Sequence, residues 1–212
     1  MPLSIKFIQI IALTLLLIPI SHANNSWRFK VFYDNTEIGE HIFKVTSMQN
    51  KTNVTIVADF NVNVFFINAY NYQHTNYETW NGECLSSIYS STDDNGEQQY
   101  VKGQADKDNF IIKTASGDNN INKNCIKSFS YWDVDILKSK QLLNSQTGEL
   151  TPVDISFVSR EDLIVRGIPT KTKRYVLKTK EFTIDLWYSN NNEWVALNST
   201  TADGTNLRYQ IQ

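Results

Sequence analysis

Apolar and polar residues alternate along most of the chain from Trp27 onwards, and turn-forming residues interrupt the alternation at short intervals. A period of two is typical of β-strands that bury one face, and helical periodicity is almost absent. About a dozen antiparallel strands in one domain favour a strongly curved sheet, half-closed or closed like a barrel, because wide twisted sheets curl or split. The pattern predicts strands at residues 27–33, 38–48, 54–66, 70–80, 84–92, 97–105, 110–115, 121–126, 150–158, 162–165, 174–178, 182–188, 194–200 and 207–211.

The longest alternating stretch runs from Val54 to Phe66 and places seven apolar residues on one face. A run of that length requires a deep, continuous core opposite it. The alternation lapses between Tyr131 and Gly148, where we expect one short helical segment near 131–140, followed by a loop at 144–148. No repeat or linker marks a domain boundary, so residues 24–212 are predicted to form a single β-rich domain.

The first 23 residues have the pattern of an export signal. Lys6 precedes an apolar run from Phe7 to Ile20, and Ser21 and Ala23 supply the small residues of a cleavage site. The apolar run is shorter than the roughly 20 residues that span a bilayer. We therefore predict a signal peptide at residues 1–23, cleaved after Ala23, and an exported protein without stable membrane insertion.

The charge balance argues against nucleic acid as a partner. The chain carries 20 Lys and Arg against 22 Asp and Glu, a net charge of −2, which offers no general attraction to phosphate backbones or anionic lipids. An outer-membrane barrel is the competing interpretation of exported alternating strands. It is disfavoured because polar residues such as Asn53, Asp59 and Asn63 would then face lipid.

Two cysteines, Cys84 and Cys125, follow the predicted signal. An even pair in an oxidising compartment indicates a disulfide, and closing a loop of about 40 residues stabilises a domain by roughly 3–4 kcal/mol in the chain-entropy model. A catalytic thiol is the alternative, but neither cysteine lies in a Cys-x-x-Cys motif.

Three residues are candidates for acid–base chemistry. His41 alternates with inward-facing residues, and a histidine changes charge near neutral pH, although a core imidazole bonded to a carbonyl fits the same pattern. His74 shares a strand face with Glu78 and several aromatic residues, which describes either a pocket or a cross-strand aromatic ladder. With only two histidines after the predicted signal and no ligand spacing, we expect neither a metal site nor a cofactor.

Several short segments together resemble one family of exported bacterial proteins of unassigned function, and the resemblance extends from Trp27 to the C-terminus. It implies a Gram-negative, periplasmic protein with one β-rich domain, and it brings no established active site. More distantly, the chain resembles the half-closed β-barrels of periplasmic lipoprotein carriers, a likeness of fold alone. The segments that carry the resemblance are 38–43, 66–70, 92–96, 131–132, 142–148 and 185–189.

Three hypotheses about function follow. The favoured one is a binding protein that holds an apolar or lipid-like molecule in the curved sheet, and it predicts a concave apolar face left unfilled. A protein-interaction module of the envelope would instead present an exposed edge strand or apolar patch. A small enzyme would pair His41 or His74 with a carboxylate such as Glu78. The residues predicted to contact the apolar ligand are Phe60, Phe66, Tyr70, Tyr72, Trp80, Tyr131 and Trp132.

Overall fold

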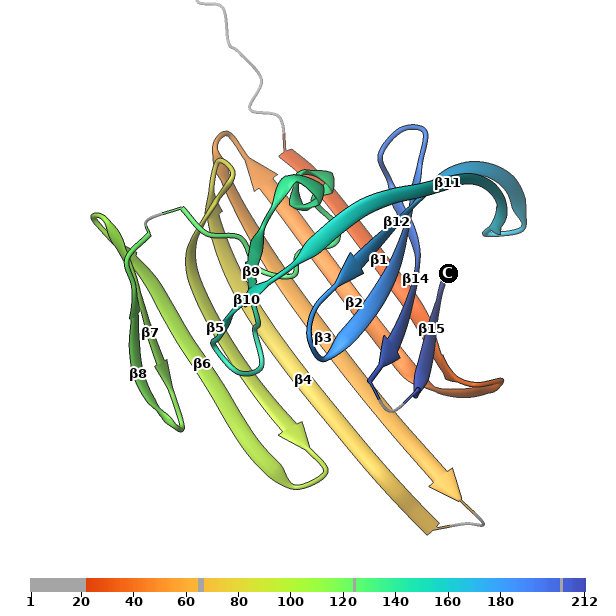
Figure 1. The fold of residues 1–212 in the computed structure, drawn as a ribbon, viewed down its shortest axis with the longest axis horizontal. Helices are drawn as coiled ribbons and strands as arrows, with labels where there is room; N and C mark the ends of the chain where they lie inside the picture. The colour runs from red at the N-terminus through yellow and green to blue at the C-terminus, as the bar shows by residue number, and fades with distance from the viewer. Residues whose placement is uncertain (1–21, 65–66, 124, 203) are drawn as a thin grey trace, which may run out of the picture.

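The computed structural model describes residues 22–64, 67–123, 125–202 and 204–212, and most of them belong to β-strands (Figure 1). The strong period-two alternation of the sequence accounts for this composition. The elements are β1 (His22–Tyr33), β2 (Thr36–Met48), β3 (Lys51–Val64), β4 (Ile67–Asn81), β5 (Cys84–Asp94), β6 (Glu97–Asp106), β7 (Asn109–Thr114), β8 (Gly117–Ile121), the 3-10 helix η1 (Val134–Lys138), β9 (Gln141–Leu143), β10 (Leu150–Pro152), β11 (Asp154–Val165), β12 (Ile168–Lys178), β13 (Phe182–Ser189), β14 (Trp194–Thr201) and β15 (Asn206–Ile211).

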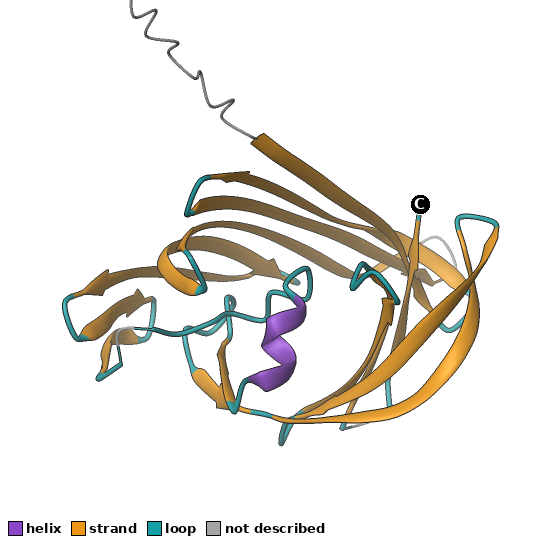
Figure 2. Ribbon diagram, turned by 90° about the horizontal axis from the view of Figure 1, so that it is seen from above, coloured by secondary structure: helices purple, strands orange, loops and turns teal. Residues whose placement is uncertain are grey.

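Thirteen of the described strands form a single antiparallel sheet in the order β11-β12-β13-β14-β15-β1-β2-β3-β4-β5-β6-β7-β8. Most neighbours in this order are also neighbours in sequence. The exception is the pairing of β15 with β1, which joins the two ends of the chain in the middle of the sheet. The sheet curves strongly, and its edges β8 and β11 do not pair with each other, so it is half-closed (Figure 2). The predicted curved β architecture is confirmed.

The chain between β8 and β11 crosses the concave side of the sheet (Figure 2). This crossover segment, residues 122–153, contains η1 and the hairpin of β9 and β10. It fills much of the space that the sheet encloses, because its apolar residues pack into the same core as the strands. The fully or almost fully buried apolar residues of the segment are Ile126, Ile136, Leu142, Leu143 and Val153.

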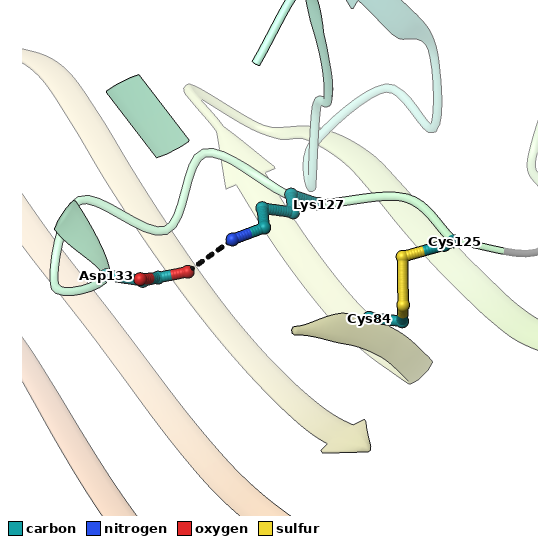
Figure 3. Close-up of a disulfide and its surroundings, with 4 residues drawn as sticks. All are labelled: Cys84, Cys125, Lys127 and Asp133. Carbon is teal, nitrogen blue, oxygen red and sulfur yellow. Dashed lines mark hydrogen bonds and ion pairs between the residues drawn. A yellow bond between two sulfur atoms is a disulfide. The ribbon is translucent and has the colours of Figure 1, made fainter. Parts of the chain in front are cut away.

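A disulfide ties the start of the crossover segment to the sheet (Figure 3). Cys84 at the start of β5 is bonded to Cys125, as predicted, and their Cα atoms lie 4.8 Å apart. Next to it, the main-chain amide of Leu85 donates to the carbonyl of Ile126 at 2.9 Å. Farther along the segment, Lys127 and Asp133 form an ion pair of 2.8 Å.

A distortion in β2 determines which of its residues face inward. Gly39 has φ of +149° and its pairing coincides with a register shift between β1 and β2. A Cβ atom at this position would clash with the carbonyl oxygen of Asp59 on β3, so only glycine fits. A regular strand would point Ile38 and His41 to opposite faces. With the distortion, both line the same cavity.

Some predicted boundaries are wrong. The sequence pattern divides residues 150–165 into strands at 150–158 and 162–165, whereas the structure has a short β10 and a continuous β11 from Asp154 to Val165. A register shift between Phe157 and Ser159 interrupts the alternation without ending the strand. The strand predicted at 121–126 is also misplaced, since β8 ends at Ile121. The predicted helical segment is present as η1, and among the described residues no helix is long and apolar enough to cross a membrane.

Candidate functional site

A cavity of about 730 Å³, which we call the groove, opens on the concave side of the sheet. Its walls come from β1 to β4 on one side and from β14, β15 and the turn between them on the other. The pairing of β15 with β1 brings these walls together. Aromatic and aliphatic side chains predominate among the residues that line the groove: Tyr33, Ile38, His41, Phe60, Val62, Tyr70, Tyr72, Thr201, Thr205, Leu207 and Tyr209.

Cross-strand pairing builds the aromatic wall of the groove. Phe60 on β3 pairs with Tyr72 on β4, and their rings stack with centroids 5.4 Å apart and planes 14° apart. Tyr209 on β15 approaches Phe60 edge-on at 6.5 Å. Because all three residues occupy inward positions of their strands, the alternating pattern alone directs their rings into the concave side.

A second, smaller cavity of about 160 Å³ adjoins the groove and shares His41 and Tyr72 with it. Two histidines border this smaller cavity, because one row of paired residues crosses the sheet from His41 through Ala58 to His74. The crossover segment covers the cavity on the other side. The residues that the segment contributes are Phe129, Tyr131, Asn144, Ser145 and Gln146.

His74 is a buried anchor for the loop between β9 and β10. Its Nδ1 lies 2.8 Å from the hydroxyl of Thr92, and its Nε2 lies 3.3 Å from the hydroxyl of Ser145. Burial lowers the pKa of His74 to about 4, so the ring is neutral near pH 7. A neutral imidazole has one donor and one acceptor nitrogen, and two hydroxyl groups satisfy both.

Further polar contacts fix the same loop against β4 and β5. The hydroxyl of Tyr72 donates to Oε1 of Gln146 at 3.1 Å, and Nε2 of Gln146 donates to Asp94 at 3.3 Å. Tyr70 also donates to Asp94, at 2.6 Å, and burial together with this carboxylate raises the pKa of Tyr70. The hydroxyl of Ser90 donates to the carbonyl of Ser145. The loop is therefore held firmly in place where it lines the smaller cavity.

His41 is different from His74 because no described residue partners its ring nitrogens. Both nitrogens are buried and without a hydrogen bond. The ring lies among aromatic rings, with centroid distances of 4.4 Å to Phe43, 5.8 Å to Tyr209 and 6.1 Å to Phe60. Burial, with His74 nearby, lowers the pKa of His41 to about 3. The ring therefore packs inside the sheet, as the interpretation of a core imidazole expects, but no described carbonyl bonds to it.

Glu78 does not form the acid–base pair that the enzyme hypothesis requires. Its carboxylate accepts hydrogen bonds from the Asn76 amide and the Trp80 indole, both at 2.9 Å. Burial raises the pKa of Glu78, although these hydrogen bonds act in the opposite direction. Glu78 is not among the described residues that line the groove or the smaller cavity. In the described part of the chain, hydroxyl groups rather than a carboxylate occupy the nitrogens of His74.

The structure divides the predicted ligand-contacting residues into two groups. Phe60, Tyr70 and Tyr72 line the groove, and Tyr131 lines the smaller cavity. The other two described members lie apart from them: Trp80 and Trp132 form an edge-to-face pair at 5.6 Å, Trp80 is 1% exposed, and Trp132 borders a different surface hollow. Phe66, the remaining member of the set, lies outside the described residues.

Sequence reasoning missed the contribution of the C-terminal strand to the groove. Leu207 and Tyr209 alternate with polar residues in the predicted strand at 207–211, which marks them as inward-facing. The pattern contains no signal that this strand pairs with β1 and so completes the groove. In the part of the chain that the structure describes, no group of three or more His, Cys, Asp and Glu side chains is placed to hold a metal ion.

Comparison with known proteins supports the fold and leaves the activity open. A family model described as a domain of unknown function, DUF6134, matches residues 29–212. No curated protein matches the chain significantly. Among solved structures, the chain is similar to the crystal structure of a beta-barrel-like protein of the domain of unknown function DUF1849 from Brucella abortus. The TM-score is 0.67 at 8% sequence identity, and the match covers 91% of this chain and 96% of the other, so the likeness concerns the fold.

Proposed function

The chain belongs to the DUF6134 family, whose function is unknown, and from this premise we propose that it is an exported binding protein that holds an apolar, lipid-like molecule in its groove. The observation that carries the proposal is the groove itself, a cavity of about 730 Å³ bounded mainly by aromatic and aliphatic side chains. Small-molecule sites typically have volumes of about 300–1,000 Å³ and linings of this kind.

The polar ends of two lining tyrosines are already used within the protein, which makes the groove more apolar than its composition suggests. The hydroxyl of Tyr70 is bonded to Asp94, and that of Tyr72 is bonded to Gln146. The rings, rather than the hydroxyl groups, are therefore the surfaces left for a ligand. Each square ångström of apolar surface that a ligand and these rings remove from water contributes about 25 cal/mol to binding.

Export is the second part of the proposal. It is supported by the signal pattern that ends at Ala23 and by the Cys84–Cys125 disulfide, which is typical of oxidising compartments. We expect the protein expressed in a Gram-negative host to accumulate in the periplasm with Asn24 as its first residue. Cell fractionation followed by intact-mass measurement tests this. A protein that stays in the cytoplasmic fraction with residues 1–23 still attached would contradict it.

A bulky substitution inside the groove should weaken binding of an apolar probe. We expect the detergent-free protein to bind diphenylhexatriene, a hydrocarbon that fluoresces in apolar surroundings, at one saturable site. Leu207 lines the groove from β15, and the larger ring of Leu207→Trp would occupy space that the probe needs. The affinity should fall by at least about tenfold, equivalent to about 1.4 kcal/mol. Fluorescence titration measures the effect.

Val57→Trp is the matched control for this experiment. It also introduces tryptophan in place of an aliphatic residue, but Val57 is 39% exposed and lies on the opposite face of β3 from the groove-lining Phe60. The control should bind diphenylhexatriene as the unsubstituted protein does. Absence of saturable binding, or equal binding by both variants, would rule out the groove as the site.

A protein-interaction role is the second candidate, and a feature of the outer face favours it. Tyr77, Tyr89 and Ile111 are 50%, 46% and 37% exposed and border a hollow of about 730 Å³ over β4 to β7. Exposed apolar clusters of this kind often mark contact surfaces. Failure of the unsubstituted protein to bind diphenylhexatriene would shift the assignment to this surface.

A further inference from the structure

The position of His41 connects the two cavities on the concave side. Its imidazole packs in a cluster of rings with Phe43, Phe60 and Tyr209, and it borders both the groove and the smaller cavity. Any molecule that fills the groove and reaches the smaller cavity would pass this imidazole. The distortion at Gly39 is what places His41 on the same face as Ile38.

The buried nitrogens of His41 have an unmet need for hydrogen bonds. Neither Nδ1 nor Nε2 has a partner among the described residues, and a buried polar group without a partner costs about 1–3 kcal/mol. Because its pKa is lowered to about 3, the ring is neutral near pH 7 and offers one donor and one acceptor. The torsion about its Cβ–Cγ bond is soft, which allows the ring to reorient towards a hydroxyl group in a cavity that it borders.

The surroundings of His41 exclude a charged partner. The described residues that line the groove and the smaller cavity include no Lys, Arg, Asp or Glu. His74 is neutral as well and is bonded to Thr92 and Ser145. A carboxylate or phosphate brought to His41 would therefore be buried without a counter-charge, which is far more costly than burying a hydroxyl group that finds a hydrogen bond.

We propose that the ligand of the groove is an apolar chain that ends in an uncharged hydroxyl group, and that His41 is the residue that binds this group. A hydroxyl both donates and accepts, which matches a neutral imidazole. The apolar chain would lie along Phe60 and Tyr72, whose rings line the groove next to His41. This inference rests on the proposed function and adds the chemical class of the ligand to it.

The test compares decanol with decanoate, which have the same chain length and differ in head group. Calorimetric titrations of the detergent-free protein at about pH 8, where a carboxylic acid is ionised, measure each affinity directly. We expect decanol to bind at least about tenfold more tightly than decanoate. The variant His41→Phe keeps an aromatic ring but removes both nitrogens, and it should weaken decanol binding by about three- to tenfold, the effect of one uncharged hydrogen bond.

Two further measurements separate loss of the hydrogen bond from loss of the groove. Diphenylhexatriene has no polar group, so His41→Phe should weaken its binding less than it weakens decanol binding. His41→Gln restores a donor and an acceptor and should recover part of the decanol affinity. Circular dichroism confirms that both variants fold.

The outcomes distinguish this inference from the proposed function. If diphenylhexatriene binds, but decanoate binds as tightly as decanol or His41→Phe leaves decanol binding unchanged, the assignment of His41 is wrong and the apolar groove stands. If neither diphenylhexatriene nor decanol binds, both the groove function and the hydroxyl assignment are overturned. Tighter binding of decanol together with its selective loss in His41→Phe supports both.

Discussion

Replacing Trp194 with alanine should lower the free energy of unfolding by about 3–5 kcal/mol, the usual cost of removing a large buried aromatic side chain. Trp194 is fully buried. Its ring centroid lies 4.4 Å from that of Phe29, 4.9 Å from that of Phe43 and 5.4 Å from that of Tyr131. These contacts join the C-terminal strands, the N-terminal strands and the crossover segment at one point. The neighbouring segments therefore cannot close the space left by the missing Trp194 ring without shifting relative to each other.

Thermal and urea unfolding of Trp194→Ala measure this effect. A domain of this size loses about 2–4 °C of melting temperature per kcal/mol, so we expect a fall of roughly 6–20 °C. Ile168→Ala is the control, because Ile168 is 65% exposed on β12 and its truncation should change stability by no more than about 0.5 kcal/mol. A loss below about 1 kcal/mol for Trp194→Ala would mean that this cluster does not hold the three segments together.

Removing the disulfide with the double variant Cys84→Ser/Cys125→Ser should cost about 4 kcal/mol, which is the loop-closure contribution expected for cysteines separated by 41 residues. Cys125 is exposed and Cys84 is half-buried, so the substitutions disturb little packing. The main effect is on the unfolded state, whose conformational entropy increases because the crossover segment is no longer tied to β5. Urea unfolding at equilibrium measures the loss.

The reducing agent dithiothreitol provides the control for the double variant. It should lower the unfolding midpoint of the unsubstituted protein to that of the variant and leave the variant unchanged. If the variant and the oxidised protein unfold at the same urea concentration, the hydrogen bond between Leu85 and Ile126 and the core contacts of the segment suffice to hold it.

Much of the local structure could be predicted from alternation and turn residues. The strand that contains Val54, Ile56 and Phe60 buries these residues together, as a period of two requires. The Asn95-Gly96 turn joins β5 to β6, and both residues have positive φ, as expected for a two-residue hairpin. The prediction failed where a strand bends, as at Phe157 and Ser159 in β11, because a bulge interrupts the pattern without ending the pairing.

The candidate site was only partly predictable. Phe60, Tyr70 and Tyr72 were expected to line a groove and do so, because nearby strands with known inward faces form that wall. Trp80 belongs to the same strand face as Tyr72, yet it packs against Trp132 away from the groove. The alternation of a strand predicts which of its faces is buried. It does not predict where along that face the crossover segment packs.

The two histidines show the same difference between what alternation predicts and what long-range packing adds. Alternation placed both on inward faces, and nothing in their neighbourhoods in sequence distinguished them. The structure brings Ser145 of the crossover segment to His74 and leaves His41 without a described partner. A residue 71 positions away along the chain therefore decides which histidine is anchored.

The amino-acid pattern was enough to predict the β class, the inward face of most strands, the helical segment and the pairing of Cys84 with Cys125, because each depends on neighbouring residues or on a unique pair of cysteines. The pairing of β15 with β1, the course of the crossover segment over the concave side and the half-closed state of the sheet became known from the three-dimensional structure. Alternation specifies which face of a strand is buried but not which distant strand becomes its neighbour. The groove lies between such distant strands, and so its existence and its lining follow from long-range packing.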